Sequence, residues 1–437
     1  MTRILAAIFL VLTFVSPVRA GLEINEVTSP GGIMAWLVEE HSIPFISLEI
    51  RFKGGTSLDL EGKRGATYMM SGLLEEGAGD LDAQEFLIAR EALAAQFGFD
   101  SHGDAVSISA KFLSENKQDS VELLRKALLE PRFDQDALDR VRAQVISIIA
   151  SDQKDPNEVA SETFDRLAYA DHPYATPSTG TADSVNLLSR DDIIDAHKNV
   201  LARDRMYVSA VGDISAEELG ALLDELLGDL PETGGPMPIR ADVNLTGGVT
   251  VVDLPTPQSV AVFGHAGIKR DDPDFFVAYV MNQVFGSSGF TSRLSNEVRE
   301  KRGLTYGVYT YLASYDLAEL YLGSVASAND RIAEAVRVIR DEWQKLAENG
   351  VTREELDAAK KYLTGAYPLR FDGNARIASI LVGMQLDDLP ITYADTRNDK
   401  INAVTQEDVA RVAKRLMRPE DLRIVVVGQP VGLESTD

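Results

Sequence analysis

The stretch MYVSAVG at residues 206–212 has a counterpart, LRIVVVG, at residues 422–428. The same offset places DDII at 191–194 on EDVA at 407–410, so the match runs without a gap across a helix, a turn and a strand. Chance similarity of secondary structure is the alternative, but an unbroken register ending in the same Val-Gly favours duplication. A repeat of this length predicts that the chain contains two copies of one structural unit.

Earlier segments of the two halves also correspond in type. Apolar and polar side chains alternate over 46–52, which predicts a half-buried strand, and 260–262 begins the equivalent strand of the second half. Further strands are expected at 105–112 and 319–327. One helical face is marked by apolar residues at intervals of four, three and four, namely Ile332, Val336, Ile339 and Trp343.

The domain organisation follows from a break between the halves. Residues 231–238, PETGGPMP, suit neither helix nor sheet, so they predict a linker, extended here to 231–245. The domains expected on either side are 21–230 and 246–437. Strands and helices mix without a strict βαβα rhythm, which predicts two related α+β domains, each a largely antiparallel sheet covered by helices.

Composition excludes several classes of protein. The chain has 437 residues and a formal net charge of −25, which argues against a nucleic-acid partner because phosphate binding needs basic surface. It has no cysteine, so neither a disulfide nor a thiolate ligand is available.

The first twenty residues have the pattern of a secretory signal. Arg3 precedes the apolar run 4–15, and small residues at Val18 and Ala20 predict cleavage after Ala20. A membrane anchor is the alternative, but the run is shorter than the roughly 20 residues that span a bilayer. We therefore expect residues 1–20 to be removed, leaving a periplasmic or secreted protein with no membrane segment.

The second half contains SRLSNEVREKRGLTYGVY at 292–309. This segment resembles the signature of the pitrilysin, insulin-degrading enzyme and mitochondrial processing peptidase family. The duplicated halves, the linker and the closing Val-Gly strands fit the same family over 22–430. The resemblance implies two domains that form a clamshell half-chamber.

Active members of that family carry an inverted zinc motif, His-x-x-Glu-His, on a helix early in the first half. Two imidazoles one helical turn apart bind the zinc, and the glutamate handles the proton of the attacking water. Here Tyr68, Ser71 and Gly72 stand at the three positions, and Ser147, followed by Ile148, stands where the third ligand is expected. These groups predict that the chain binds no metal and has no catalytic residue of its own at this site.

Other residues offer no obvious replacement. No two of the histidines lie within five residues of each other, so surface or hydrogen-bonded roles are expected, with His172 closing a turn. Glu75 and Glu76 follow the lost motif, in the expected last turn of its helix before Gly77, but point in different directions, which favours solvated surface. The histidines are His41, His102, His172, His197 and His265.

Arg299 and Tyr306 match a pair that the family uses in its second half. The resemblance implies that they bind the substrate backbone and stabilise the oxyanion at a zinc site across the clamshell. The alternatives are that Arg299 is a solvated surface charge and that Tyr306 packs within a strand. A nearby turn either contacts an extended substrate or starts the next helix, and it comprises Gly286, Ser287, Ser288 and Gly289.

In two-chain members of the family, one subunit holds zinc and the other lacks the ligands. The chain resembles the ligand-free subunit, so we expect it to bind peptide or unfolded protein and to form a heterodimer with a zinc-bearing homologue. The zinc is expected in that partner only. Two alternatives remain open: an assembly or peptide-binding protein without peptidase activity in any complex, and a chain active alone through another metal site. Homodimer formation is also left open.

Overall fold

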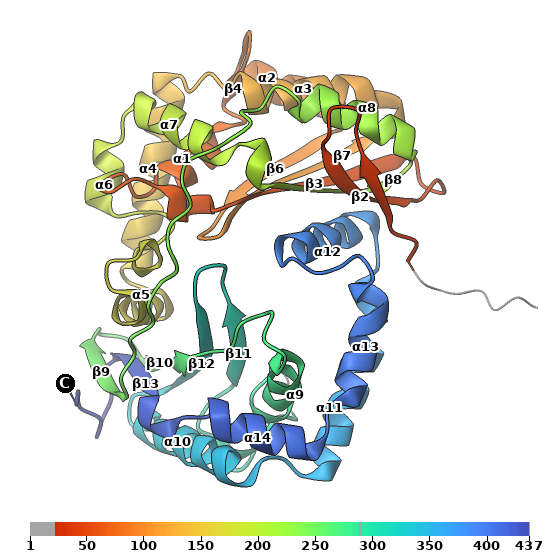
Figure 1. Cartoon of the computed structure of the whole chain (residues 1–437). Helices are drawn as coiled ribbons and strands as arrows, with labels where there is room; N and C mark the ends of the chain where they lie inside the picture. The colour runs from red at the N-terminus through yellow and green to blue at the C-terminus, as the bar shows by residue number, and fades with distance from the viewer. Residues whose placement is uncertain (1–21, 288–290, 437) are drawn as a thin grey trace, which may run out of the picture.

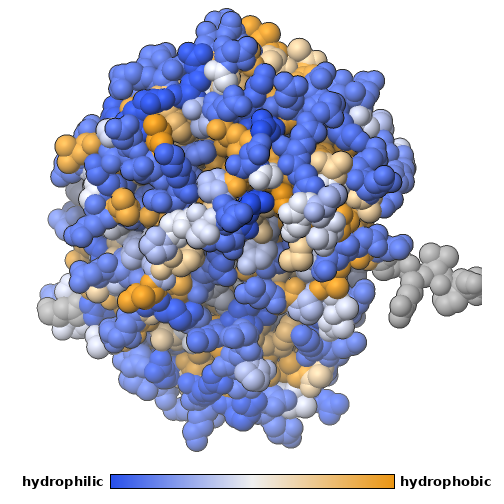
Figure 2. Space-filling view, turned by 45° about the horizontal axis from the view of Figure 1, so that its top comes forward, coloured by the Kyte–Doolittle hydropathy of each residue, from blue (hydrophilic) through white to orange (hydrophobic). Residues whose placement is uncertain are grey.

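The computed structural model describes residues 22–287 and 291–436. It shows two sheets, one in each half of the chain, with most helices on the side of each sheet that faces away from the other half (Figure 1). The visible surface is mainly hydrophilic, with hydrophobic side chains in small separate groups (Figure 2). The predicted signal sequence, residues 1–20, lies outside the described residues.

The first sheet has six strands in the order β1-β2-β8-β3-β7-β6. Neighbours are antiparallel except β2 and β8, which are parallel. The strands are β1 (Asn25–Thr28), β2 (Met34–Glu39), β3 (Phe45–Lys53), β6 (Gln96–Ser101), β7 (Ala105–Leu113) and β8 (Met206–Gly212), and a separate small hairpin pairs β4 (Gly77–Ala78) with β5 (Leu81–Asp82).

The second sheet repeats the topology of the first. Its order, β9-β13-β10-β12-β11, follows β2-β8-β3-β7-β6, and its single parallel pair, β9 with β13, corresponds to β2 with β8. The repeated stretches 206–212 and 422–428 thus form equivalent central strands. The strands are β9 (Gly248–Asp253), β10 (Gln258–Ala266), β11 (Val308–Ser314), β12 (Glu319–Ala328) and β13 (Arg423–Gly428). The predicted duplicated α+β fold is confirmed.

Helices cover the outer faces of the two sheets and close two separate apolar cores. In the first half the helices are α1 (Ala66–Leu73), α2 (Ala83–Ala92), α3 (Lys117–Leu129), α4 (Gln135–Asp152), α5 (Pro156–Tyr169), α6 (Ala182–Leu187), α7 (Arg190–Val200) and α8 (Ala216–Leu227). In the second half they are α9 (Phe275–Phe285), α10 (Ile332–Asn349), α11 (Arg353–Ala366), α12 (Asn374–Leu386), α13 (Tyr393–Ala403) and α14 (Gln406–Leu416). The predicted apolar face lies on α10, where all four of its residues are buried.

One helix of each half packs on the inner face of the sheet in the other half. Helix α12 packs on β3 and β8, and Leu381 is wholly buried in an apolar cluster with Trp36 and Val211. Helix α5 packs on β10, β12 and β13, where Phe164 is 1% exposed. This reciprocal exchange joins the halves through two apolar interfaces.

The exchange corrects the expectation that the strand over 46–52 is half-buried. Its apolar residues enter the first core as predicted, but Ser47 and Glu49 on the other face are also buried, at 2% and 9% exposure. The cause is α12, which covers that face: Ser209 Oγ on neighbouring β8 donates a hydrogen bond to Ala378 O at 2.7 Å. Strand β3 is therefore buried on both sides.

Between α8 and β9 the chain runs without helix or strand over 228–247, which includes the predicted linker 231–245. His172 Nε2 lies 3.0 Å from Ile239 O in this stretch. Among the residues that the structure describes, no helix is both long and apolar enough to cross a bilayer.

Candidate functional site

The helix expected to carry the metal ligands is α1, and its side chains do not suit a metal. Tyr68 is partly buried against the first core. Ser71 is 3% exposed and donates its hydroxyl to Thr67 O at 3.0 Å, which binds it to its own helix. Gly72 is exposed and has no ligand atom, and a methyl group placed there would lie 3.5 Å from Val141 Cγ1 of α4.

Helix α4 packs against α1 and brings the remaining position to the same region. Ser147 and Ile148 are both exposed on it. Neutral hydroxyls bind zinc weakly and an alkyl side chain does not bind it at all. Over 22–287 and 291–436, no three His, Asp or Glu side chains are grouped closely enough to hold a metal ion. The residues present do not fit zinc.

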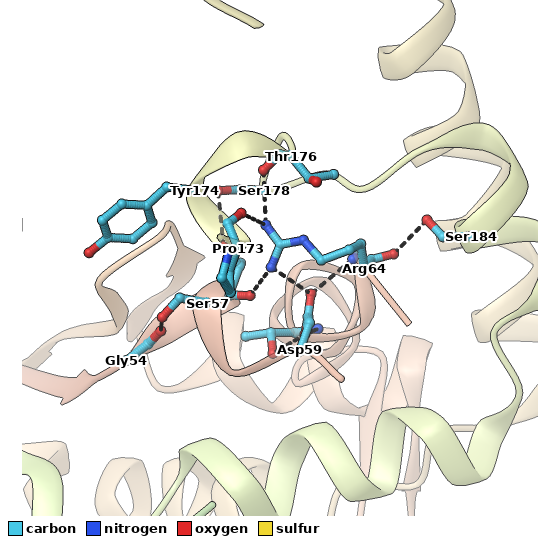
Figure 3. A network of polar contacts seen from close by, with 12 residues as sticks. Gly54, Ser57, Asp59, Arg64, Pro173, Tyr174, Thr176, Ser178 and Ser184 are labelled. Atoms are coloured by element: carbon cyan, nitrogen blue, oxygen red, sulfur yellow. Dashed lines mark hydrogen bonds and ion pairs between the residues drawn. The ribbon is translucent and has the colours of Figure 1, made fainter. Parts of the chain in front are cut away.

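A buried polar network nevertheless fixes the start of α1 (Figure 3). The Asp59 carboxylate, whose side chain is 0% exposed, accepts hydrogen bonds from Gly65 N at 2.9 Å, Thr67 N at 2.9 Å and Thr67 Oγ1 at 2.6 Å. It thereby caps the helix N-terminus. Burial raises the pKa of Asp59 despite these donors.

Arg64 extends this network to the segment that leads from α5. Its guanidinium donates to Pro173 O at 3.0 Å, to Thr176 O at 2.9 Å and to Thr56 O, and it lies 3.9 Å from Asp59. Nothing in the local sequence pattern singled out Asp59 or Arg64. The partners of Asp59 are local, whereas Pro173 and Thr176, which accept from Arg64, lie over a hundred residues away. Buried polar contacts thus fix the start of α1, while the helix carries no metal ligand at Tyr68, Ser71 or Gly72.

The histidines have separate structural roles. His265 is fully buried, accepts from Trp343 Nε1 at 3.2 Å, and has a pKa lowered to about 4 by burial. His172 accepts from Tyr174 N at 3.2 Å and begins a short helical turn. His41 lies 2.8 Å from Asp213, whose hydrogen bond raises the histidine pKa. His197 Nε2 lies 2.8 Å from Leu128 O, and His102 Nδ1 accepts from Asp104 N at 3.3 Å.

Glu75 and Glu76 follow α1, which ends at Leu73, so they lie beyond the helix rather than in its last turn as expected. Glu75 forms an ion pair with Arg90, and Glu76 forms one with Arg140 at 2.7 Å. The two carboxylates therefore face different neighbours and do not form a pair.

Arg299 and Tyr306 lie in one pocket of about 480 Å³ on the second half. Arg299 belongs to a π-helical turn, Ser295–Glu300, a distortion often found at functional sites. Tyr306 is 90% exposed, so it does not pack within the sheet. Thr305 holds the intervening turn, since its hydroxyl donates to Ala326 O at 2.6 Å. The structure thus brings the two predicted residues together.

The cations next to Arg299 have different surroundings. Lys301 and Arg302 both pair with Glu297, at 2.5 and 2.8 Å, and the hydrogen bond from Lys301 is the main cause that lowers the pKa of that carboxyl. Arg299 Nη1 lies 3.6 Å from Glu300 Oε1, beyond hydrogen-bond distance. Its side chain is 29% exposed at the pocket.

The predicted turn after α9 is described only at its start. Gly286 O accepts from Thr310 N of β11 at 2.6 Å, and a Cβ at Gly286 would lie 2.3 Å from Thr310 Oγ1. Ser287 Oγ donates to Gln283 O at 3.2 Å. Ser288 and Gly289 lie outside the described residues. Gly286 and Ser287 therefore adjoin β11 but are not part of the lining of the Arg299 pocket.

Comparison with known proteins finds relatives that are similar in sequence and in structure. The family described as peptidase M16 inactive domain matches residues 187–363. A non-peptidase homologue from Helicobacter pylori is 25% identical over 390 residues, covering 89% of this chain and 90% of the relative. The crystal structure of a peptidase M16 inactive domain from Pseudomonas fluorescens has a TM-score of 0.86 at 26% identity, covering 94% of this chain and 99% of that chain. The M16 peptidase family is therefore the one that the chain resembles over most of its length.

This is the pitrilysin and processing-peptidase family that the segment 292–309 resembled. An uncharacterised zinc protease from Streptomyces coelicolor is also similar, 24% identical over 405 residues that cover 90% of this chain and 87% of the relative. Tyr68, Ser71 and Gly72, which stand in place of metal ligands, agree with the similarity to an inactive M16 domain and to a relative described as a non-peptidase homologue.

Proposed function

We propose that this M16 homologue is the non-catalytic subunit of a zinc metallopeptidase, binding peptides and completing the active site of a zinc-bearing homologous partner. The proposal rests on finding, in one chain, both the loss of the metal ligands and a pocket that contains the predicted substrate-binding pair. Its own metal positions are occupied by Tyr68, Ser71, Gly72 and Ser147, while Arg299 and the exposed Tyr306 share a solvent-accessible pocket. A site that retains only one of its two halves is useful when the other half comes from another chain.

Arg299 and Tyr306 supply donors of the kind that acyl transfer requires. A guanidinium and a phenol hydroxyl both donate hydrogen bonds, and such donors lower the barrier when they point at the oxygen that becomes negative in the transition state. In the proposed complex, a zinc ion held by the partner would supply the activation of the attacking water. The present chain contributes hydrogen bonds to the substrate carbonyl and holds the peptide in place.

Peptide capture is proposed at the outer edge of β11. This strand ends the second sheet as the structure describes it. Gly286 and Asn282 already bond the backbone of Thr310, so an added strand would pair with the rest of this edge. Tyr309 and Tyr311, 45% and 42% exposed, stack on each other along it with ring centroids 6.2 Å apart. Backbone pairing at such an edge depends little on peptide sequence, which suits a subunit that admits many substrates.

The proposal places the complex in the periplasm or outside the cell, after removal of residues 1–20. It also names a heterodimer, because a second copy of this chain lacks the same ligands. Size measurement of the mature chain, alone and mixed with a zinc-bearing homologue, tests both statements about assembly.

Reconstitution tests the function directly. The mature chain, mixed with its zinc-bearing homologue, is expected to raise peptide cleavage above that of the homologue alone. The double variant R299Q/Y306F should lose most of this gain while still assembling. A matched control, R337Q/Y362F, changes an exposed arginine and an exposed tyrosine on α10 and α11 and should keep it.

Two results would contradict the proposal. Stable assembly without any gain in cleavage would favour an assembly protein, and unchanged activity in R299Q/Y306F would remove the role of the pair. Cleavage by the isolated chain would instead reveal a metal site elsewhere.

A further inference from the structure

A second pocket, of about 580 Å³, lies between the two halves and concentrates positive charge. Five arginines from separate segments line it, together with a single carboxylate, Asp387. This is unusual in a chain whose net charge is −25. The arginines are Arg51 of β3, Arg270 before α9, Arg370 after α11, Arg376 of α12 and Arg397 of α13.

The guanidinium charges in this pocket are poorly compensated. Arg397 is 5% exposed, yet its hydrogen bonds go to the neutral oxygens of Leu363, Asn398 and Tyr279, at 3.1 to 3.3 Å. Within the described part of the chain it has no carboxylate within 4.0 Å. Removing a charge from water without an opposite charge is costly.

Arg51 is nearly as isolated. Its nearest carboxylate, Glu49, lies 4.0 Å away, and burial raises the pKa of Glu49 to about 7, so this carboxyl is only partly ionised at neutral pH. Arg51 Nε is buried and makes no hydrogen bond to the described residues. Its Nη2 reaches only Ser379 Oγ, at 3.4 Å.

Arg370 and Arg376 are exposed at the pocket, and neither side chain has an ion pair among residues 22–287 and 291–436. They are free to bind an incoming group. Asp387 is the one carboxylate in the lining and lies 4.0 Å from Arg270, so a single negative charge faces five guanidinium groups.

Aromatic rings hold two of the arginines in fixed orientations. Arg270 lies over Phe275, 4.2 Å from the ring centroid, and Arg397 lies over Tyr367 at the same distance. An aromatic ring covers only the face of a guanidinium group. The N–H groups at its edge can therefore still donate to a carboxylate or phosphate.

We infer that this arginine pocket binds anionic groups carried by a peptide, namely the carboxylates of acidic side chains. The inference rests on the proposed function, because the peptide is the occupant of the chamber. The pocket adjoins a larger cavity of about 860 Å³ between the halves and shares Arg270, Phe275 and Tyr393 with it. That cavity is lined by both signs of charge, whereas the arginine pocket is strongly basic, so acidic residues of a peptide are attracted to the arginines.

Calorimetric titration of the mature chain tests the inference with capped peptides of equal length. One peptide carries several glutamates, one has glutamine in their place, and one has lysine. The acidic peptide should bind about ten-fold or more tightly than the glutamine peptide, because each charged hydrogen bond outweighs a neutral one. Added salt should reduce this preference.

Variants localise the effect. R370Q/R376Q should weaken binding of the acidic peptide about ten-fold and leave the glutamine peptide unaffected, since both arginines are exposed and lack ion pairs. R337Q/R353Q removes the same charge from exposed positions on α10 and α11 outside the pocket and should bind as the parent does. An equal loss in this control would overturn the assignment. Thermal unfolding of each variant checks that it is folded.

Inorganic phosphate separates a peptide site from a small-anion site. Phosphate that binds in the absence of any acidic-peptide binding would overturn the inference. Equal binding of the acidic and glutamine peptides would do the same, while leaving the proposed peptide-binding function intact. Acidic-peptide binding without any gain of cleavage in the reconstituted pair would refute the proposed catalytic role and keep the arginine pocket.

Discussion

Replacing Glu49 with glutamine is expected to stabilise the protein at pH 8 and to change its stability little at pH 5. Glu49 lies on β3, is 9% exposed beneath α12, and has Arg51 as its nearest cation at 4.0 Å. Burial raises the pKa of its carboxyl from 4.5 to about 7, more than Arg51 lowers it. Glutamine fills the same space without an ionisable group.

The direction of this pH dependence of stability follows from the number of protons that the folded and unfolded chains bind. Because the pKa is higher in the folded state, the folded chain binds more protons, and stability falls as pH rises from about 4.5 to about 7. Above pH 7 the Glu49 carboxyl is ionised, and its burial lowers the free energy of unfolding by the full amount. At about 1.4 kcal/mol for each pH unit between the two pKa values, that cost is on the order of 3 kcal/mol at pH 8 and less than about 1 kcal/mol at pH 5.

Urea unfolding at both pH values measures the difference between variant and parent. Taking this difference removes the contributions of other carboxyls, such as Asp165, whose pKa burial also raises to about 7. Glu26→Gln, at an exposed position of β1, should show no such pH dependence. If Glu49→Gln destabilises the chain equally at both pH values, Glu49 is held by specific contacts as a carboxylate and the argument from burial is wrong.

Two further outcomes are expected. The purified mature chain, dialysed against trace zinc, should contain far less than stoichiometric metal by elemental mass spectrometry, and a chelator should not shift its thermal unfolding; one bound equivalent would show ligands outside α1 and α4. Leu381→Ala should lower the free energy of unfolding by about 2–5 kcal/mol because it opens a cavity under α12, whereas Leu187→Ala, at a 73% exposed position, should change it little. Equal effects of the two leucine variants would contradict the role given to α12.

Much of the fold was predictable because periodicity reports burial. The strands expected at 105–112 and 319–327 correspond to β7 and β12, and the repeat predicted the equivalence of β8 and β13. Periodicity does not report which element covers a surface. Ser47 and Glu49 looked solvent-facing because they are polar, yet a helix more than three hundred residues away covers them.

The candidate site was predictable only where its residues are neighbours in sequence. Arg299 and Tyr306 lie in one local segment, so the sequence could single out the pair, and the structure places both residues in one pocket. Their role in binding substrate stays a prediction. The arginine pocket draws residues from both ends of the chain, from Arg51 to Arg397. Net charge gave no sign of it, because the sum over a chain hides how the charges are distributed.

The exchanged helices bear on where a complete active site can form. Opening the chain would pull α12 from β3 and α5 from β10, exposing Leu381, Phe164 and their neighbours. Each such side chain costs about 1.5–3 kcal/mol when it leaves its apolar surroundings, so the two halves should behave as one unit. Under the proposed function, a peptide then reaches Arg299 and Tyr306 through the space between two chains, and movement of one whole chain against its partner would control its entry.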